Sequence, residues 1–113
     1  MADEVQTSKE DGMYMVRLSG RPDVASDEAK STIDGLLGEN SSEKLPVLVD
    51  FSQITGMNSS GVGLLFYLLT ESEKRGVPVR FFRVNDLTQK VLTVAGMEDI
   101  VAIYPDEAAA RAG

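Results

Sequence analysis

Apolar and polar stretches follow one another along the chain in blocks that predict strands and helices in turn. The apolar-rich stretch 13–18 predicts a strand, and the turn signal at 10–12 predicts a hairpin with residues 5–9. Residues 45–51 hold an unbroken apolar run, which is typical of a strand covered on both faces. Further strands are predicted at residues 78–83 and 100–104.

Helices are predicted between capping and stop signals. The first covers residues 26–38, with Ser26 as its capping hydroxyl and acidic residues in its first turn. Gly35 lies inside it and lowers its stability by about 1 kcal/mol relative to Ala, so we expect this helix to be the weakest element. Other helices are predicted at residues 59–75, 86–95 and 106–112.

The apolar positions of two helices predict which faces are buried. In the 59–75 helix, a set with i, i+3, i+4, i+7 spacing should face the sheet: Val62, Leu65, Phe66 and Leu69. This leaves Leu64, Tyr67 and Leu68 on other faces, either as a partner-binding surface or covered by the 86–95 helix. In the 86–95 helix, one face is shared by Leu87, Val91 and Val94.

This order of elements predicts an α/β fold. We expect residues 1–113 to form a single domain, in which a single-layer mixed β-sheet of four to five strands carries four helices. The hairpin supplies the antiparallel part, and each parallel crossover should be right-handed. The 45–51 strand should lie inside the sheet, because its apolar run needs cover on both faces.

The composition excludes several kinds of chemistry. The chain contains no His and no Cys, so it holds no Ser-His-Asp triad, cysteine nucleophile or disulfide. A zinc site is also disfavoured without these ligands. A site made of carboxylates alone stays open, but the acidic residues are scattered over predicted turns and helix ends. We expect a protein that is not an enzyme and has neither a metal site nor a cofactor.

The net charge of −7 disfavours nucleic acids and anionic membranes as main partners. The acidic start at residues 1–4 lacks a hydrophobic signal segment, and the longest apolar run, residues 62–69, is too short to span a bilayer. The expected location is the cytoplasm. Residues 74–90 contain five basic side chains and one acidic side chain. These basic residues form either a solvated surface or a docking rim for an acidic partner.

Residues 50–65 carry the most information about function. They read as a buried strand, a polar turn and a helix start at which Asn58, Ser59 or Ser60 can cap unpaired backbone N–H groups. Three interpretations are open: a structural turn, an anion site, or a serine that accepts a phosphoryl group from a partner. The glycine spacing matches neither a dinucleotide fingerprint nor a P-loop, and no adjacent base activates either serine as a nucleophile.

The segment VLVDFSQITGMNSSGVGLL resembles the signature of the STAS domain, which sulfate transporters and anti-sigma-factor antagonists share. The segments MVRLSGRPDVA and VPVRFFRVNDLTQKVLTVAGMEDIVAIYPDEAAA extend the resemblance over nearly the whole chain. It implies a bacterial, stand-alone partner-switching protein that binds an anti-sigma kinase. In that family the kinase phosphorylates a serine, and a metal-dependent serine phosphatase reverses the modification.

Carried onto this chain, the resemblance makes Ser59 the phosphorylated serine, followed by Ser60 and Gly61. Asn58 stands where the family usually has Asp, so the cap remains but its charge is lost. Some family members are scaffolds or subunits of lipid-transport systems and are not phosphorylated. The sequence therefore leaves three hypotheses: a phosphorylated antagonist that regulates transcription, a constitutive STAS scaffold or transporter-associated subunit, and a binder of small ligands.

Overall fold

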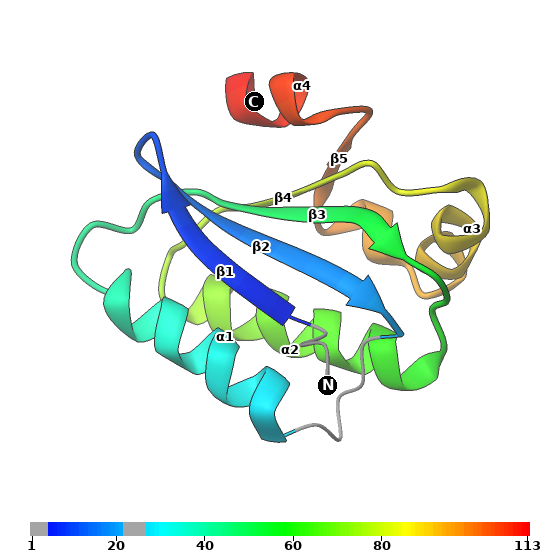
Figure 1. The fold of residues 1–113 in the computed structure, drawn as a ribbon, viewed down its shortest axis with the longest axis horizontal. Helices are drawn as coiled ribbons and strands as arrows, with labels where there is room; N and C mark the ends of the chain where they lie inside the picture. Colours follow the sequence, from blue (N-terminus) through cyan, green and yellow to red (C-terminus); the bar gives the residue numbers. More distant parts are fainter. Residues whose placement is uncertain (1–4, 22–26) are drawn as a thin grey trace.

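The computed structural model describes residues 5–21 and 27–113 of the chain (Figure 1). The predicted cap at Ser26 and the acidic start at residues 1–4 lie outside the described residues. The elements are, in chain order, β1 (Val5–Glu10), β2 (Met13–Gly20), α1 (Asp27–Glu39), β3 (Val47–Ile54), α2 (Ser59–Lys74), β4 (Val79–Phe82), α3 (Asp86–Val94), the 3-10 helix η1 (Met97–Asp99), β5 (Ala102–Tyr104) and α4 (Glu107–Ala112). The predicted α/β class is confirmed, and η1 is an element that the sequence pattern did not predict.

The first two strands form the predicted hairpin. β1 and β2 pair antiparallel from Val5–Leu18 to Glu10–Met13. Asp11 and Gly12 connect them, and both have positive φ angles, of 50° and 76°. A two-residue turn with this geometry matches the twist of the strands, and glycine adopts it without steric cost.

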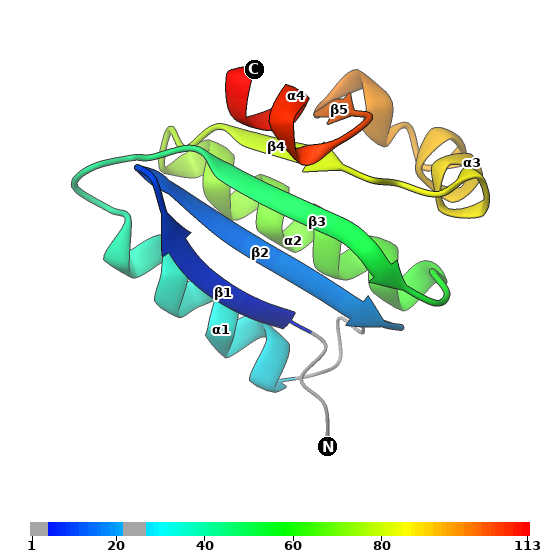
Figure 2. The same ribbon diagram turned by 45° about the horizontal axis from the view of Figure 1, so that its top comes forward.

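The sheet has the strand order β1-β2-β3-β4-β5, and every pair after the hairpin is parallel. The strands are added in one direction, so right-handed crossovers place the connecting helices α1, α2 and α3 on one side of the sheet. Figure 2 shows α1 and α2 beneath the strands, with α4 on the opposite side. The fold is therefore a mixed sheet with helices on both faces.

The core lies on both faces of β3, as its apolar run predicts. Val47, Val49 and Phe51 face the layer of α1 and α2 and are buried, and the Phe51 and Phe81 rings lie 4.8 Å apart. A smaller cluster on the α4 side contains Met15, Leu48, Phe82 and Ala110. Because β3 lies at the centre of the sheet and is buried on both faces, it provides a rigid support for the loop between β3 and α2.

Candidate functional site

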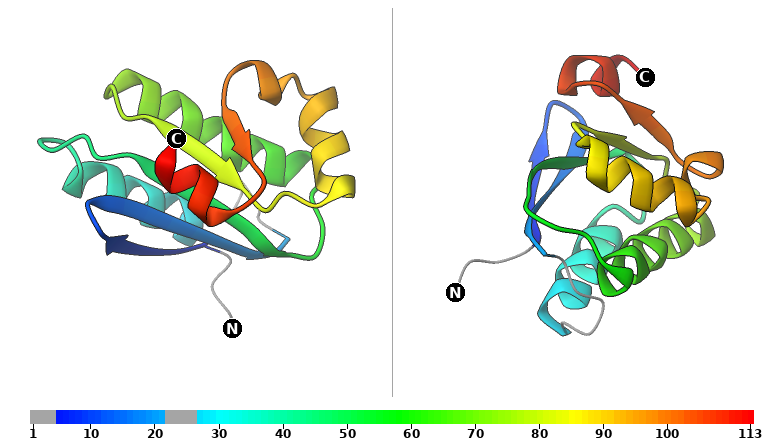
Figure 3. Two further views of the ribbon diagram at one scale, coloured as in Figure 1. Left: turned by 90° about the horizontal axis from the view of Figure 1, so that it is seen from above. Right: turned by 90° about the vertical axis from the view of Figure 1, so that its right-hand side faces the viewer.

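Three helices begin at one edge of the sheet. α1, α2 and α3 follow β2, β3 and β4, so their first turns lie beyond the carboxyl ends of these parallel strands. Seen from the two directions of Figure 3, α3 lies beside the N-terminal part of α2. In open α/β sheets this edge commonly carries the functional site.

Asn58 caps α2, as the sequence predicts. Its backbone is extended, and its side-chain Oδ1 accepts a hydrogen bond from the Gly61 N–H at 3.1 Å. Its carbonyl oxygen accepts from the Val62 N–H at 3.0 Å and so closes the first helical turn. The amide therefore satisfies one of the backbone donors that every helix start leaves unpaired.

Ser59 is the first residue of α2 and is exposed. Ser60 is half-buried, and Gly61 is buried. The first turn of α2 has no acidic side chain, so the partial positive charge of the helix N-terminus is not offset by a carboxylate of that turn. Of the two serines, Ser59 is thus the more accessible, in a local field that favours an anion.

Backbone contacts fix the loop before Ser59. The N–H of Thr55 donates to the Gly20 carbonyl at 2.9 Å, which ties the loop to the end of β2. At the end of β3, the buried side chain of Asp50 accepts a hydrogen bond from the Ser52 N–H at 2.8 Å and forms an ion pair with Arg17 at 3.8 Å.

Among the residues that the structure describes, no group of three or more acidic side chains is arranged to hold a metal ion.

The predicted partner surface on Leu64, Tyr67 and Leu68 is wrong. Leu64 and Leu68 are each only 1% exposed and belong to the core. Tyr67 packs against that core, and its hydroxyl donates to Asp34 of α1 at 2.5 Å. These side chains lie between α2, the sheet and α1, so a partner has no access to the two leucines.

The face of α2 that packs on the sheet also differs from the prediction. Leu65 is buried as expected, whereas Phe66 is 37% exposed and Val62 and Leu69 are half-buried. The buried positions are Gly61, Leu64, Leu65, Leu68 and Ser72. The helix is rotated by about one residue relative to the expected face, because α1 as well as the sheet covers it.

The apolar face of α3 points outward. Leu87 is 76% exposed and Val94 is 90% exposed, while the helix buries Thr88 and Leu92 instead. α3 lies beside the start of α2, so Leu87 and Val94 are exposed apolar side chains on the helix next to the site. Their regular spacing was visible in the sequence, but the direction in which they point was not.

Most of the basic cluster between residues 74 and 90 is engaged within the protein. Lys74 and Arg75 pair with the Glu71 carboxylate at 3.1 and 3.0 Å, and Arg80 donates to the Ala110 carbonyl. Arg83 and Lys90 are exposed. The interpretation as a docking rim therefore applies to these two residues at most.

Neighbouring residues shift the pKa values of two titratable groups of α2. The hydrogen bond to Asp34 raises the pKa of the Tyr67 phenol, and burial adds to the shift. Hydrogen bonds from Lys74 and Arg75 lower the pKa of the Glu71 carboxyl. Both residues lie away from the helix start, so these shifts concern how α2 is held and not the chemistry at Ser59.

The family model of the STAS domain matches residues 4–110 of the chain. The chain belongs to the STAS domain family. The resemblance seen in the sequence is thereby confirmed, and the match extends from the hairpin to α4.

Solved structures show the same STAS fold. An anti-sigma factor antagonist from Mycobacterium paratuberculosis is 17% identical, with a TM-score of 0.73 over 96% of this chain and 90% of that one. The anti-sigma factor antagonist SpoIIAA in its unphosphorylated form is 18% identical, with a TM-score of 0.69 over 91% and 89% of the two chains. A serine-to-glutamate variant of RsbS from Moorella thermoacetica is 14% identical, with a TM-score of 0.77 over 97% and 93%.

Comparison with curated proteins gives no match. In the part of the chain that the structure describes, no helix combines the length and the apolar character that crossing a membrane requires.

Proposed function

We propose that this STAS domain is a cytoplasmic partner-switching regulator, an anti-sigma-factor antagonist that reversible phosphorylation of Ser59 controls. The single observation that carries the proposal is the exposed Ser59 at the capped start of α2. The proposed partners are an anti-sigma factor serine kinase and a metal-dependent serine phosphatase. The protein itself has no catalytic role in either reaction.

The comparisons support the proposal through the proteins they describe. SpoIIAA is an anti-sigma factor antagonist, and structures exist of its unphosphorylated form and, at 20% identity to this chain, of its phosphorylated form. At these identities the likeness concerns the fold. The transfer of phosphorylation to Ser59 rests on the position of that residue in the motif and on its exposure.

The partner kinase supplies most of the groups that phosphorylation of Ser59 needs. The Ser59 Oγ attacks the γ-phosphorus of ATP, its proton passes to a base of the kinase, and ADP leaves with its magnesium ion. The phosphatase reverses the modification by hydrolysis, which transfers the phosphoryl group to water. No step uses a histidine or cysteine of this chain, which has neither.

The added phosphate changes binding more than folding. The phosphate adds a charge of about −1.5 to −2 at the N-terminus of α2, where backbone N–H groups and the helix dipole favour an anion. The same charge lies where a partner must displace water, so it weakens the complex. This difference makes Ser59 usable as a switch.

The partner surface that we propose joins Ser59 to the exposed face of α3. Leu87 and Val94 lie on the helix beside the start of α2 and contribute large exposed apolar side chains. Such side chains close to a polar switch site are typical of a protein interface. This surface replaces the one predicted on Leu64 and Leu68.

A second candidate function is supported by Asn58. The residue caps α2 through its amide oxygen and has no negative charge to offer a kinase or a magnesium ion. A constitutive scaffold or a subunit of a lipid or anion transporter needs the cap but not the charge. In this case the same surface binds its partner permanently.

The experiment is incubation of the protein with candidate serine kinases from the same genome and MgATP, followed by intact-mass measurement and phosphosite mapping. One added phosphate at Ser59, absent from Ser59→Ala and retained in Ser60→Ala, supports the switch. Modification at Ser60 alone contradicts the assignment. A stable complex with no modification supports the scaffold.

A further inference from the structure

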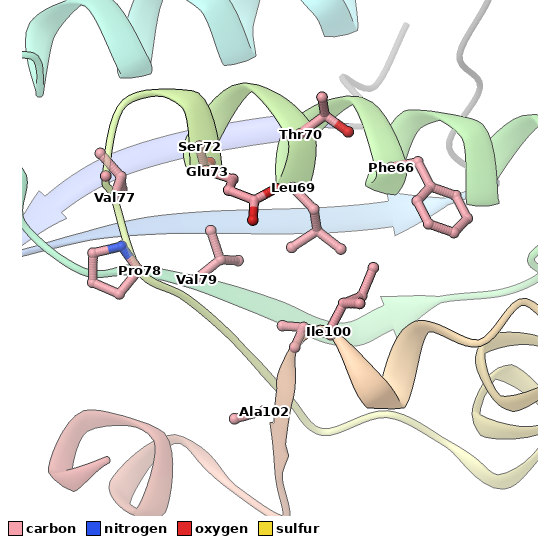
Figure 4. Close-up of a pocket in the computed structure, with 12 residues that line it drawn as sticks. Phe66, Leu69, Thr70, Ser72, Glu73, Val77, Pro78, Val79, Ile100 and Ala102 are labelled. Atoms are coloured by element: carbon pink, nitrogen blue, oxygen red, sulfur yellow. The ribbon is translucent and has the colours of Figure 1, made fainter.

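The two ends of α2 differ in the charged side chains around them. A groove runs along its C-terminal half, bounded by the segment before β4 and by the start of β5, and in the described part of the chain no Lys or Arg side chain lines it (Figure 4). At the other end of α2, where Ser59 lies, Figures 1 and 2 show the end of β2 close to the first turn of the helix. Arg21 directly follows β2 and therefore belongs to this end.

Arg21 lies against the loop that leads to Ser59. The backbone N–H groups of Thr55 and Gly56 both donate to the Gly20 carbonyl, at 2.9 and 3.4 Å, so the loop runs beside the end of β2. A Cβ atom at position 56 would lie only 2.8 Å from Nε of Arg21 and 3.5 Å from its Cζ. The side chain of Arg21 thus lies directly on the backbone of Gly56, in space that a side chain at this position would occupy.

The Arg21 guanidinium has no hydrogen-bonding partner among the described residues. Arg21 is exposed and forms neither an ion pair nor a side-chain hydrogen bond there, whereas Arg17, Arg75 and Arg111 all pair with carboxylates. A guanidinium group prefers two parallel hydrogen bonds to the oxygens of a carboxylate or a phosphate. Arg21 therefore presents an unused anion-binding group on the loop before Ser59.

A phosphate on Ser59 is within reach of this group. Gly56 and Ser59 are three residues apart, so their Cα atoms are separated by at most about 11 Å even in a fully extended chain. The two residues between them leave the space free, because Met57 packs against the core and the Asn58 side chain accepts from the Gly61 N–H. The flexible side chains at positions 21 and 59 can meet across this span.

Other charged groups at this edge of the sheet oppose or support a phosphate. The first turns of α1 and α3 contain Asp27, Glu28 and Asp86, and Arg83 follows β4. The three carboxylates disfavour a phosphate dianion by like charge, so the dianion is stabilised where a cation offsets them. Arg21 packs on the Ser59 loop itself, and Arg83 provides a comparison from the other side of β3.

We infer that Arg21 binds the phosphoryl group of phosphorylated Ser59 and holds it on the loop between β3 and α2. The inference rests on the proposed phosphorylation of Ser59 and names the residue of this chain that receives the added group. In the unmodified form the guanidinium is exposed to a partner, and in the phosphorylated form the phosphate covers it. Phosphorylation thus adds an anion to the partner surface and at the same time withdraws a cation from it.

The test uses protein in which phosphoserine is incorporated at position 59 during synthesis, so no kinase is needed. ³¹P NMR measures the second pKa of the phosphate, which is about 6 for free phosphoserine. Arg21→Gln should raise this pKa by about 0.5 relative to the phosphorylated protein that retains Arg21, because the dianion loses its partner. In ¹⁵N-labelled protein, the Arg21 Nε–H signal should shift in step with this titration. Equal pKa values with and without Arg21 would overturn the inference.

Two substitutions separate pairing with Arg21 from the general field at this edge. Arg83→Gln removes the same charge from the end of the neighbouring strand and should raise the phosphate pKa by less than half as much. An effect as large as that of Arg21→Gln would contradict specific pairing. Arg21→Lys should recover part of the lowered pKa, since an ammonium group keeps the charge but not the two parallel hydrogen bonds.

Gly56→Ala tests the contact itself. Gly56 does not have a positive φ angle, so alanine fits the backbone and its methyl group displaces the flexible Arg21 side chain. In the phosphorylated protein this change should raise the phosphate pKa nearly as much as Arg21→Gln, and the double variant should show no further rise. Full additivity of the two changes would contradict the inference. The unfolding midpoint of each variant shows whether the fold is retained.

This test and the kinase experiment fail separately. If candidate kinases leave Ser59 unmodified, the proposed function is wrong, while the incorporated phosphoserine still reports on Arg21. If Ser59 is phosphorylated and Arg21→Gln leaves the phosphate pKa unchanged, the switch is retained and the role of Arg21 is refuted.

Discussion

α2 and α3 begin in the same way but use their apolar side chains differently. Each has an asparagine cap, with Asn58 accepting from the Gly61 N–H and Asn85 accepting from the Thr88 N–H at 2.8 Å. α2 buries Leu64, Leu65 and Leu68 between the sheet and α1, whereas Leu87 and Val94 of α3 are exposed to the solvent. Regular apolar spacing therefore identifies a face of a helix, but the neighbours of that helix decide whether the face is core or contact surface.

The largest effect expected from this comparison is in the core of α2. Leu64→Ala and Leu68→Ala should each lower the free energy of unfolding by about 2–5 kcal/mol, because each leaves a cavity. Urea unfolding followed by circular dichroism measures the loss. A cost below about 1 kcal/mol at both positions would show that these leucines are not core residues.

The caps should behave alike in the two helices. Asn58→Ala and Asn85→Ala should each cost about 1 kcal/mol, since each leaves a backbone N–H without its acceptor. Asn58→Asp should be neutral or slightly stabilising, because negative charge suits a helix N-terminus. Thermal unfolding of the three variants provides the measurement, and no change in Asn58→Ala would mean that the side chain serves as a partner contact instead.

A smaller effect should come from the contact that holds α2 to α1. Tyr67→Phe removes the hydrogen bond to Asp34 and should cost about 0.5–1.5 kcal/mol at neutral pH. Since the pKa of Tyr67 is raised in the folded state, its contribution is complete below the ordinary pKa of a phenol and is lost as pH rises through the folded value. The difference from the unmodified protein should therefore shrink above about pH 10.

Stability measurements between pH 7 and 11 follow this loss. A difference that stays constant or grows over the alkaline range would rule out the contribution of the Tyr67 proton.

The smallest change in stability is expected on the exposed face of α3. Leu87→Ser and Val94→Ser should alter the free energy of unfolding by no more than about 0.5 kcal/mol. On the proposed account they still weaken binding to the partner, which a pull-down with the cognate kinase measures. A large loss of stability would place these side chains in the core after all.

The local features of the fold could be predicted from the sequence. The hairpin turn at Asp11 and Gly12, the cap at Asn58 and the buried run in β3 depend on residues close together in the chain, and all three are present. The orientation of α2 and of α3 could not be predicted, because it depends on which elements pack beside them. Phe66 and Leu87 have the same apolar character as core residues, and only the fold shows that they are exposed.

In the candidate site, too, the local features could be predicted and the spatial arrangement could not. The motif predicted that Ser59 and Asn58 lie together at a helix start, since they are neighbours in the sequence. The position of α3 beside the start of α2 could not be predicted, because the two helices are separated by β4 in the chain and come together only in the fold.

The proposed switch at Ser59 can be tested directly by comparing two forms of the protein. The partner kinase is titrated into the unmodified chain and into the chain phosphorylated at Ser59, and the dissociation constant and unfolding midpoint of each are measured. Phosphorylation of Ser59 should raise the dissociation constant at least about tenfold and leave the unfolding midpoint unchanged. Equal dissociation constants for the two forms would contradict the proposed switch.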